Sequence, residues 1–88
     1  MSDVRVDEAL WASNILPEGV VDRWFFADGA IVTLGDRIAE VRIEDARHEI
    51  TAPVSGRLMI VAATNALVEP GSLLARLVVD EKAPRDRQ

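Results

Sequence analysis

The sequence predicts an all-β domain: a flattened β-barrel, or barrel-sandwich hybrid, of two pseudo-symmetric four-stranded antiparallel sheets. Two observations lead to this fold class. No window of about 11 residues keeps apolar side chains at helical spacing, whereas short apolar runs recur between turn signals. In addition, residues 30–41 are repeated in residues 66–77 at a constant spacing of 36 positions. Closing two such copies into one barrel protects the edge strands that isolated hairpins leave open.

The repeat combines identical residues with chemically similar ones. Ile31, Ile38 and Val41 correspond to aliphatic residues in the second copy, and each half begins with a glycine, Gly19 or Gly56, before an apolar strand. Because the halves share one strand-turn-strand pattern, they predict two related sheets. The identical pairs are Ala30 with Ala66, Val32 with Val68, Gly35 with Gly71, and Ala39 with Ala75.

Along the chain, the pattern predicts about seven or eight short strands separated by glycine, proline and asparagine turns. Residues 39–43 alternate apolar and charged side chains, so one face of this strand is core and the other meets solvent. Residues 20–26 and 58–63 are apolar with little alternation, which is typical of strands covered on both sides, and we expect the core to centre on them. Ile50 and Ala52, and then Ala75, Leu77 and Val79, belong to further core-facing sets.

The length of 88 residues favours a single domain, because a second core would have almost nothing to bury. The apolar fraction of 49% and charged fraction of 28% are those of an ordinary folded protein. We expect a flexible N-terminus over residues 1–7, the domain over residues 8–79, and a disordered polar tail over residues 80–88. Val4 and Val6 alternate with charges, which leaves open an additional first strand.

Composition also excludes several functions. The chain has no cysteine, so it offers no disulfide, thiolate nucleophile or cysteine-ligated metal. Its net charge of −5 disfavours binding to nucleic acid or to an anionic membrane. The first ten residues are acidic rather than basic and apolar, unlike a secretory signal, and we expect a cytoplasmic location.

A series of short motifs then follows a known order, from about Leu16 to Val79. In their order, spacing and duplication, they resemble those of the lipoyl and biotinyl attachment domains, in particular the lipoyl-like domain of 2-oxo acid dehydrogenase acyltransferases. The resemblance implies a flattened barrel of the hammerhead type. The matching motifs are Glu18-Gly19, Trp24, Val32, Gly35-Asp36, Ile38-Ala39-Glu40, Ala52-Pro53-Val54-Ser55-Gly56 and Val68-Glu69-Pro70-Gly71.

The resemblance implies a modified lysine at a hairpin tip, eight residues before the proline of the alanine-proline turn. Counting back from Pro53 gives Asp45, within a tip of Glu44, Asp45 and Ala46. Amide formation with lipoate or biotin needs an amine, and Lys82 in the tail is the only lysine. Arg47 is no substitute, because a guanidinium stays protonated. The sequence therefore predicts no covalent lipoyl or biotin cofactor. An acidic tip that contacts a partner remains open beside a turn that simply favours aspartate.

Other polar residues give weaker candidates. His48, with Glu44 and Glu49, would be a poor metal-ligand set, because one histidine and two carboxylates on a hairpin lack fixed geometry. Ser55 as a nucleophile would need His48 as its base, but it belongs to a structural turn. We therefore expect no catalytic residue and no metal site, and a histidine that faces solvent or a neighbouring strand.

The aromatic residues divide into a cluster and a single tryptophan. Trp24, Phe25 and Phe26 are adjacent, and we expect them in the core because three aromatic side chains supply much of the burial of a small domain. A docking surface is the alternative for this cluster. Trp11 precedes the matching region in a polar setting, which makes it the better interface candidate.

Three functions are then open. The first is a non-enzymatic lipoyl-like interaction module that has lost the cofactor site and binds protein subunits of a multienzyme complex. The second is a swinging-arm carrier of a 2-oxo acid dehydrogenase, a glycine cleavage system or a biotin-dependent carboxylase, which the missing lysine disfavours. The third is a small enzyme or ligand-binding protein that reuses the barrel, and we rank it last.

Overall fold

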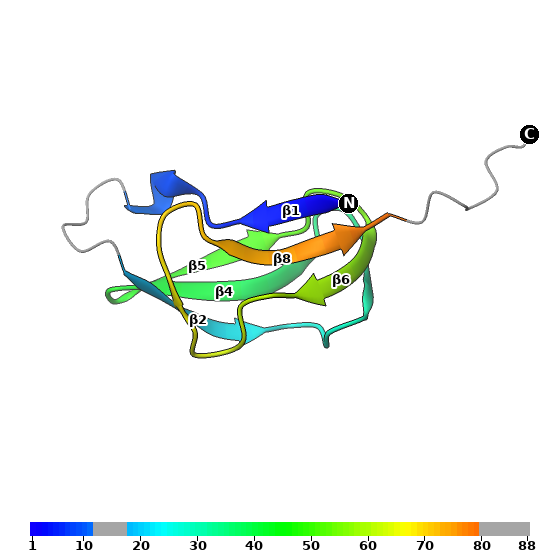
Figure 1. The fold of residues 1–88 in the computed structure, drawn as a ribbon. Coiled ribbons are helices and arrows are strands. Elements are labelled where there is room, and N and C mark those ends of the chain that lie inside the picture. The colour runs from blue at the N-terminus through cyan, green and yellow to red at the C-terminus, as the bar shows by residue number, and fades with distance from the viewer. Residues whose placement is uncertain (12–17, 80–88) are drawn as a thin grey trace, which may run out of the picture.

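The fold consists of two four-stranded antiparallel sheets that face each other (Figure 1). The computed structural model describes residues 1–11 and 18–79. One sheet has the order β1-β8-β6-β3 and the other β5-β4-β2-β7, as the all-β prediction requires. The elements are β1 (Ser2–Arg5), the 3-10 helix η1 (Glu8–Trp11), β2 (Gly19–Trp24), β3 (Ile31–Val32), β4 (Arg37–Ile43), β5 (Ala46–Thr51), β6 (Gly56–Ile60), β7 (Leu67–Val68) and β8 (Leu73–Val78).

The two sheets keep separate ladders, so the barrel is a flattened sandwich with pinned corners rather than a closed ring of strands. At one corner Gly35 N donates to Ala52 O and Ala52 N donates to Asp36 O, each at 2.9 Å. At the other corner Gly71 N donates to Val6 O and Val6 N to Ser72 O, also at 2.9 Å. These bonds satisfy backbone groups that would otherwise be open at the sheet edges.

The sheets are related by the internal repeat that the sequence predicts. Replacing β5, β4, β2 and β7 by β1, β8, β6 and β3 converts the order of one sheet into that of the other. The pairing Val32 with Gly56 recurs as Val68 with Gly19. The two hairpin-like halves therefore fold into the same arrangement, and each sheet takes strands from both.

A β-bulge explains why the glycines that open the halves are 37 positions apart although the rest of the repeat has a spacing of 36. The register between β2 and β4 shifts between Val21 and Arg23, which leaves Asp22 as an extra residue. Between β6 and β8 the register is unbroken. A bulge inserts one residue into one strand and re-aims the local side chains. Asp22 is thus the residue that the second half lacks.

The N-terminal segment differs from its prediction. Residues 1–7 were expected to be flexible, but Ser2–Arg5 form β1, which pairs with β8, and Val4 and Val6 are buried. The physical reason is that β1 supplies to its sheet the edge strand that β5 supplies to the other. Without it, the core would be open on one side. The predicted disordered tail, residues 80–88, lies outside the described residues, so the proposed domain limits of 8–79 stay a prediction at their C-terminal end.

The core consists of aliphatic side chains that the pseudo-symmetry pairs. Within residues 1–11 and 18–79, sixteen apolar residues are buried, and fourteen of them form seven equivalent pairs, for example Val32 with Val68 and Ile38 with Leu74. The remaining two, Trp11 and Ile43, both lie beside Gly19. The other pairs are Val21 with Leu58, Ala39 with Ala75, Val41 with Leu77, Ile50 with Val4, and Ala52 with Val6.

Alternation was a better guide to burial than hydrophobicity. The apolar side chains of residues 39–43 are buried as predicted, and so are those of Ile50 and Ala52. The expectation that residues 20–26 and 58–63 are covered on both sides was wrong. Met59 and Val61 are exposed because each sheet has only one inner face. Val79, expected in the core, follows the end of β8 and is 41% exposed.

Within residues 1–11 and 18–79, no helix reaches the length and apolar character needed to cross a membrane.

Gly56 is required by close approach of the backbone. A Cβ atom there would lie 2.7 Å from the carbonyl oxygen of Val78, whereas at the equivalent Gly19 the nearest atom is the Ile43 side chain at 3.1 Å. We predict that Gly56→Ala lowers the free energy of unfolding by about 1–3 kcal/mol, because β6 must move away from β8. Urea unfolding measures this change. Gly19→Ala is the matched control and should cost less, and an equal loss would contradict the explanation.

Candidate functional site

The β4–β5 hairpin contains Asp45, the position at which the family resemblance implies a modified lysine. Ile43 pairs with Ala46, so Glu44 and Asp45 make a two-residue turn between the strands. All of the residues from Glu44 to Ala46 are exposed, and the turn lies at the end of the molecule opposite the N-terminus (Figure 1). Glu44 adopts a φ of 55°, in the left-handed region that non-glycine residues seldom enter. The tip therefore presents two adjacent carboxylates to solvent.

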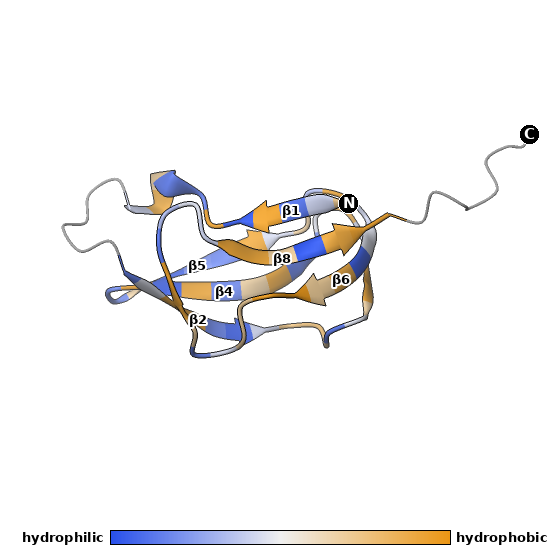
Figure 2. Ribbon diagram, in the orientation of Figure 1, coloured by the Kyte–Doolittle hydropathy of each residue, from blue (hydrophilic) through white to orange (hydrophobic). Residues whose placement is uncertain are grey.

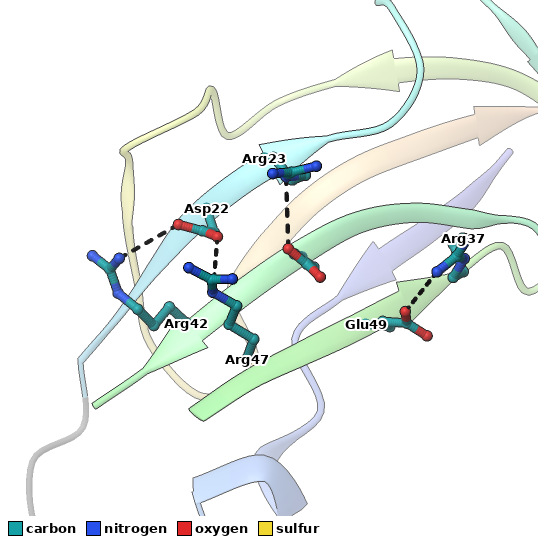
Figure 3. Close-up of polar contacts among 7 residues, drawn as sticks. Asp22, Arg23, Arg37, Arg42, Arg47 and Glu49 are labelled. Carbon is teal, nitrogen blue, oxygen red and sulfur yellow. Dashed lines mark hydrogen bonds and ion pairs between the residues drawn. The ribbon is translucent and has the colours of Figure 1, made fainter. Parts of the chain in front are cut away.

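In the stem of the hairpin, the carboxylate of Asp22 forms ion pairs with two arginines. Arg42 and Arg47 lie directly opposite each other on β4 and β5. Asp22, from the bulge of β2, binds both: its Oδ1 is 3.4 Å from Arg42 Nη1 and its Oδ2 is 3.4 Å from Arg47 Nε (Figure 3). Like charges directly across a strand pair repel, and a carboxylate between them offsets this repulsion. Asp22 therefore connects the hairpin stem to the neighbouring strand.

The same outer face continues as a row of paired charges. Arg23 lies 3.7 Å from Glu40, and Arg37 lies 3.0 Å from Glu49 (Figure 3). Phe25 is positioned between these two arginines, each guanidinium being 5.6 Å from the ring centroid. Such cation–π contacts contribute about 0.5–1 kcal/mol at exposed sites. On this face the charged groups are thus engaged within the sheet.

The polar candidates His48 and Ser55 have the following surroundings in the structure. His48 lies opposite Val41 on the neighbouring strand and is half-buried. Ser55 Oγ accepts a hydrogen bond from Leu34 N at 2.8 Å, which is a role in the turn. In the part of the chain that the structure describes, no three histidine, aspartate or glutamate side chains gather as a metal site would require. Ser55 thus has a structural partner in the turn, and the prediction that the chain has no catalytic residue stays a prediction.

Two expectations for the aromatic residues need correction. Trp11, the predicted interface residue, is only 6% exposed and belongs to the core. It is the last residue of the 3-10 helix η1 and lies beside Gly19, where it covers the hairpin end of the sandwich. Trp11 has no equivalent residue in the internal repeat. Trp24 and Phe26 pack against the core as predicted, and Trp24 Nε1 donates to Ala62 O at 2.9 Å. Phe25, however, is 37% exposed, because it points to the outer face.

Asp22 is the residue that the sequence prediction missed. It stood within an apolar run expected to be buried on both sides, and an aspartate there had no assigned partner. The change in spacing from 37 to 36 between the two halves was the available signal, because it implies one extra residue between Gly19 and Ala30. Its position as the bulge residue is visible only from the strand register.

Comparison with protein families agrees with this geometry. The model of the biotin and lipoyl attachment family, described as "Biotin-requiring enzyme", matches residues 12–77, or 66 of the 88 residues. The chain belongs to this family. The predicted resemblance to the lipoyl and biotinyl attachment domains is thereby confirmed. Biotin and lipoyl attachment domains are carrier modules that are not catalytic themselves, and they typically interact with protein subunits of multienzyme complexes. A comparison with curated proteins finds no match.

The bridging role of Asp22 can be measured through stability. We predict that Asp22→Asn lowers the free energy of unfolding by about 1 kcal/mol, because Arg42 and Arg47 lose their shared carboxylate and face each other unscreened. The loss should shrink in 1 M salt, where charges are screened over about 3 Å. Glu49→Gln is the matched control, since it removes the partner of one exposed arginine only. A loss for Asp22→Asn that is no larger than the control, or that does not respond to salt, would contradict the role.

Proposed function

We propose that this member of the biotin and lipoyl attachment family is a non-enzymatic interaction module that works without a covalent cofactor. The observation that carries the proposal is the chemistry of the hairpin tip. The two turn residues are Glu44 and Asp45, and the only lysine of the chain, Lys82, is 37 positions further along. A carboxylate does not form the amide that attaches lipoate or biotin, so the tip has no group to modify.

The rest of the domain supports retention of the family's scaffold. The core pairs, the pinned corners and the two-residue turn are intact in a chain whose tip carries no amine. The Asp22 bridge ties the stem of the hairpin to β2, which gives the tip a defined position relative to the sheet. An exposed tip on a stem that is tied to the sheet suits recognition by a protein subunit, because ordering before binding reduces the conformational entropy lost on binding.

A working swinging-arm carrier is the second candidate, and family membership is the observation that favours it. A carrier of this kind moves acyl, aminomethyl or carboxyl groups on a cofactor attached to the hairpin lysine. For this chain that activity would require modification at Lys82, which the turn does not contain. The two candidate functions therefore differ in the expected mass of the protein: a carrier gains the mass of an attached cofactor, and a module without cofactor does not.

We predict that the intact mass of the full chain stays unchanged after co-expression with lipoyl and biotin ligases. Asp45→Lys places an amine in the two-residue turn, and we predict that this variant gains one lipoyl or biotinyl group. Intact-mass spectrometry of the purified proteins measures both outcomes. A cofactor-sized increment on the unaltered chain would overturn the proposal and support the carrier.

Two control variants separate the amine from its charge and position. Asp45→Arg brings a positive charge to the same place without an acyl acceptor, and it should stay unmodified. Glu44→Lys moves the amine by one residue and should be modified less than Asp45→Lys, because ligases of this class read the shape of the turn. Equal modification of both lysine variants would show that the position of Asp45 is not the one that matters.

A further inference from the structure

Arg57 stands apart from the other arginines of the described chain. Of the seven arginines in residues 1–11 and 18–79, six lie within 4.0 Å of a carboxylate. Arg57, on β6, is the exception within these residues, and it is exposed. Its positive charge is thus available in a protein whose net charge is −5.

Apolar side chains lie directly beside Arg57 on the outer face of its sheet, and the next row of this face holds Arg76, which pairs with Asp3. Arg57 pairs with Ile31 on one side and with Val78 on the other, so the three side chains form one row across β3, β6 and β8. Met59 lies two residues further along β6 and therefore points to the same face. Ile31 is 68% exposed and Met59 is 45% exposed. We call Ile31, Arg57, Met59 and Val78 the Arg57 surface.

The pseudo-symmetry explains why this surface lacks its own carboxylate. In the other sheet the bulge of β2 adds Asp22, and this extra residue forms an ion pair with both Arg42 and Arg47. The β6–β8 register has no bulge, so no residue of β6 takes the place of Asp22. The next residue of β6 that faces outward is Met59. In the Arg57 sheet, Asp3 pairs with Arg5 and Arg76, whereas Arg57 has aliphatic residues as its cross-strand neighbours and no carboxylate within 4.0 Å among the described residues.

In Figure 2 the ribbons of β6 and β8 are mostly hydrophobic in colour and are interrupted by hydrophilic segments. One arginine without a carboxylate partner among the described residues is a poor match for nucleic acid or an anionic membrane, which bind several basic groups together. It matches a protein surface that offers one carboxylate among apolar side chains, because interfaces combine an apolar centre with an enriched arginine.

We infer that the Arg57 surface docks a partner protein, through an aspartate or glutamate of that partner held between aliphatic side chains. Val78 ends β8 beside the N-terminal strand, so this surface lies toward the end of the domain away from the hairpin turn (Figure 1). Docking here leaves the tip accessible. The inference is independent of the proposed function and holds for a carrier and for a module without cofactor.

Photo-crosslinking of the full chain tests the inference. Ile31 is replaced by a benzophenone amino acid in the cells that normally make the protein, and crosslinked peptides are identified by mass spectrometry. We expect one partner protein, crosslinked through a segment with aspartate or glutamate among aliphatic residues. Arg57→Glu should reduce the crosslinks at least about tenfold, the loss typical of a broken interfacial charge pair, and Arg57→Lys should retain most of them.

The pseudo-equivalent Leu67 provides the matched control. It is exposed to a similar extent, 71%, but lies in the other sheet, and its crosslinks should not depend on Arg57. Circular dichroism checks that the Arg57 variants are folded. The inference is overturned if Arg57→Glu leaves the crosslinks unchanged. It is also overturned if Ile31 crosslinks to residues 80–88 of its own chain, to a second copy, or to nucleic acid. None of these results alters the mass measurement that tests the proposed function.

Discussion

The fold depends on the burial of the two inner sheet faces against each other. Full burial of an aliphatic side chain contributes about 1.5–3 kcal/mol, and in this domain fourteen of the sixteen buried residues contribute as equivalent pairs, such as Val41 with Leu77. Neither half can bury its apolar face alone, because each sheet takes strands from both halves. The strand order, the corner hydrogen bonds and the need for β1 all follow from this shared core.

Residues without an equivalent in the internal repeat make the two ends and the two outer faces of the molecule different. Trp11 and Ile43 have no buried partners in the repeat, and they close the sandwich at the hairpin end. Asp22 has no counterpart in β6, and it bridges the two arginines of the hairpin stem. A strictly symmetric chain would have two equivalent ends. In this chain one end has the acidic turn between β4 and β5, and at the other end β8 finishes beside the start of β1.

This organisation agrees with membership of a family of carrier modules, which are not catalytic themselves. A core of this size leaves little material for a deep cleft, and recognition needs only a rigid surface with a few well-placed groups. The acidic turn and the Arg57 surface carry opposite charges on different parts of the domain. The partner contacts proposed for these two places would therefore not compete for the same residues.

Much of the architecture was determined by the sequence alone. The repeat of residues 30–41 in 66–77 and the turn signals specified two related sheets, and strict alternation identified the buried face of residues 39–43. The motif order also identified the family and directed attention to a tip at Asp45. These features are local or periodic, so they can be read without knowing which strands are neighbours.

Only the tertiary structure decided the burial of Trp11, the pairing of β1, the exposure of Phe25 and the charge partners of Asp22. Each depends on which strands lie side by side and on a bulge that changes the register by one residue. A one-residue change in register moves side chains to the opposite face of a sheet, and hydrophobicity alone does not record it. For the same reason, only the arrangement of the strands shows that Arg57 has no carboxylate partner among the described residues.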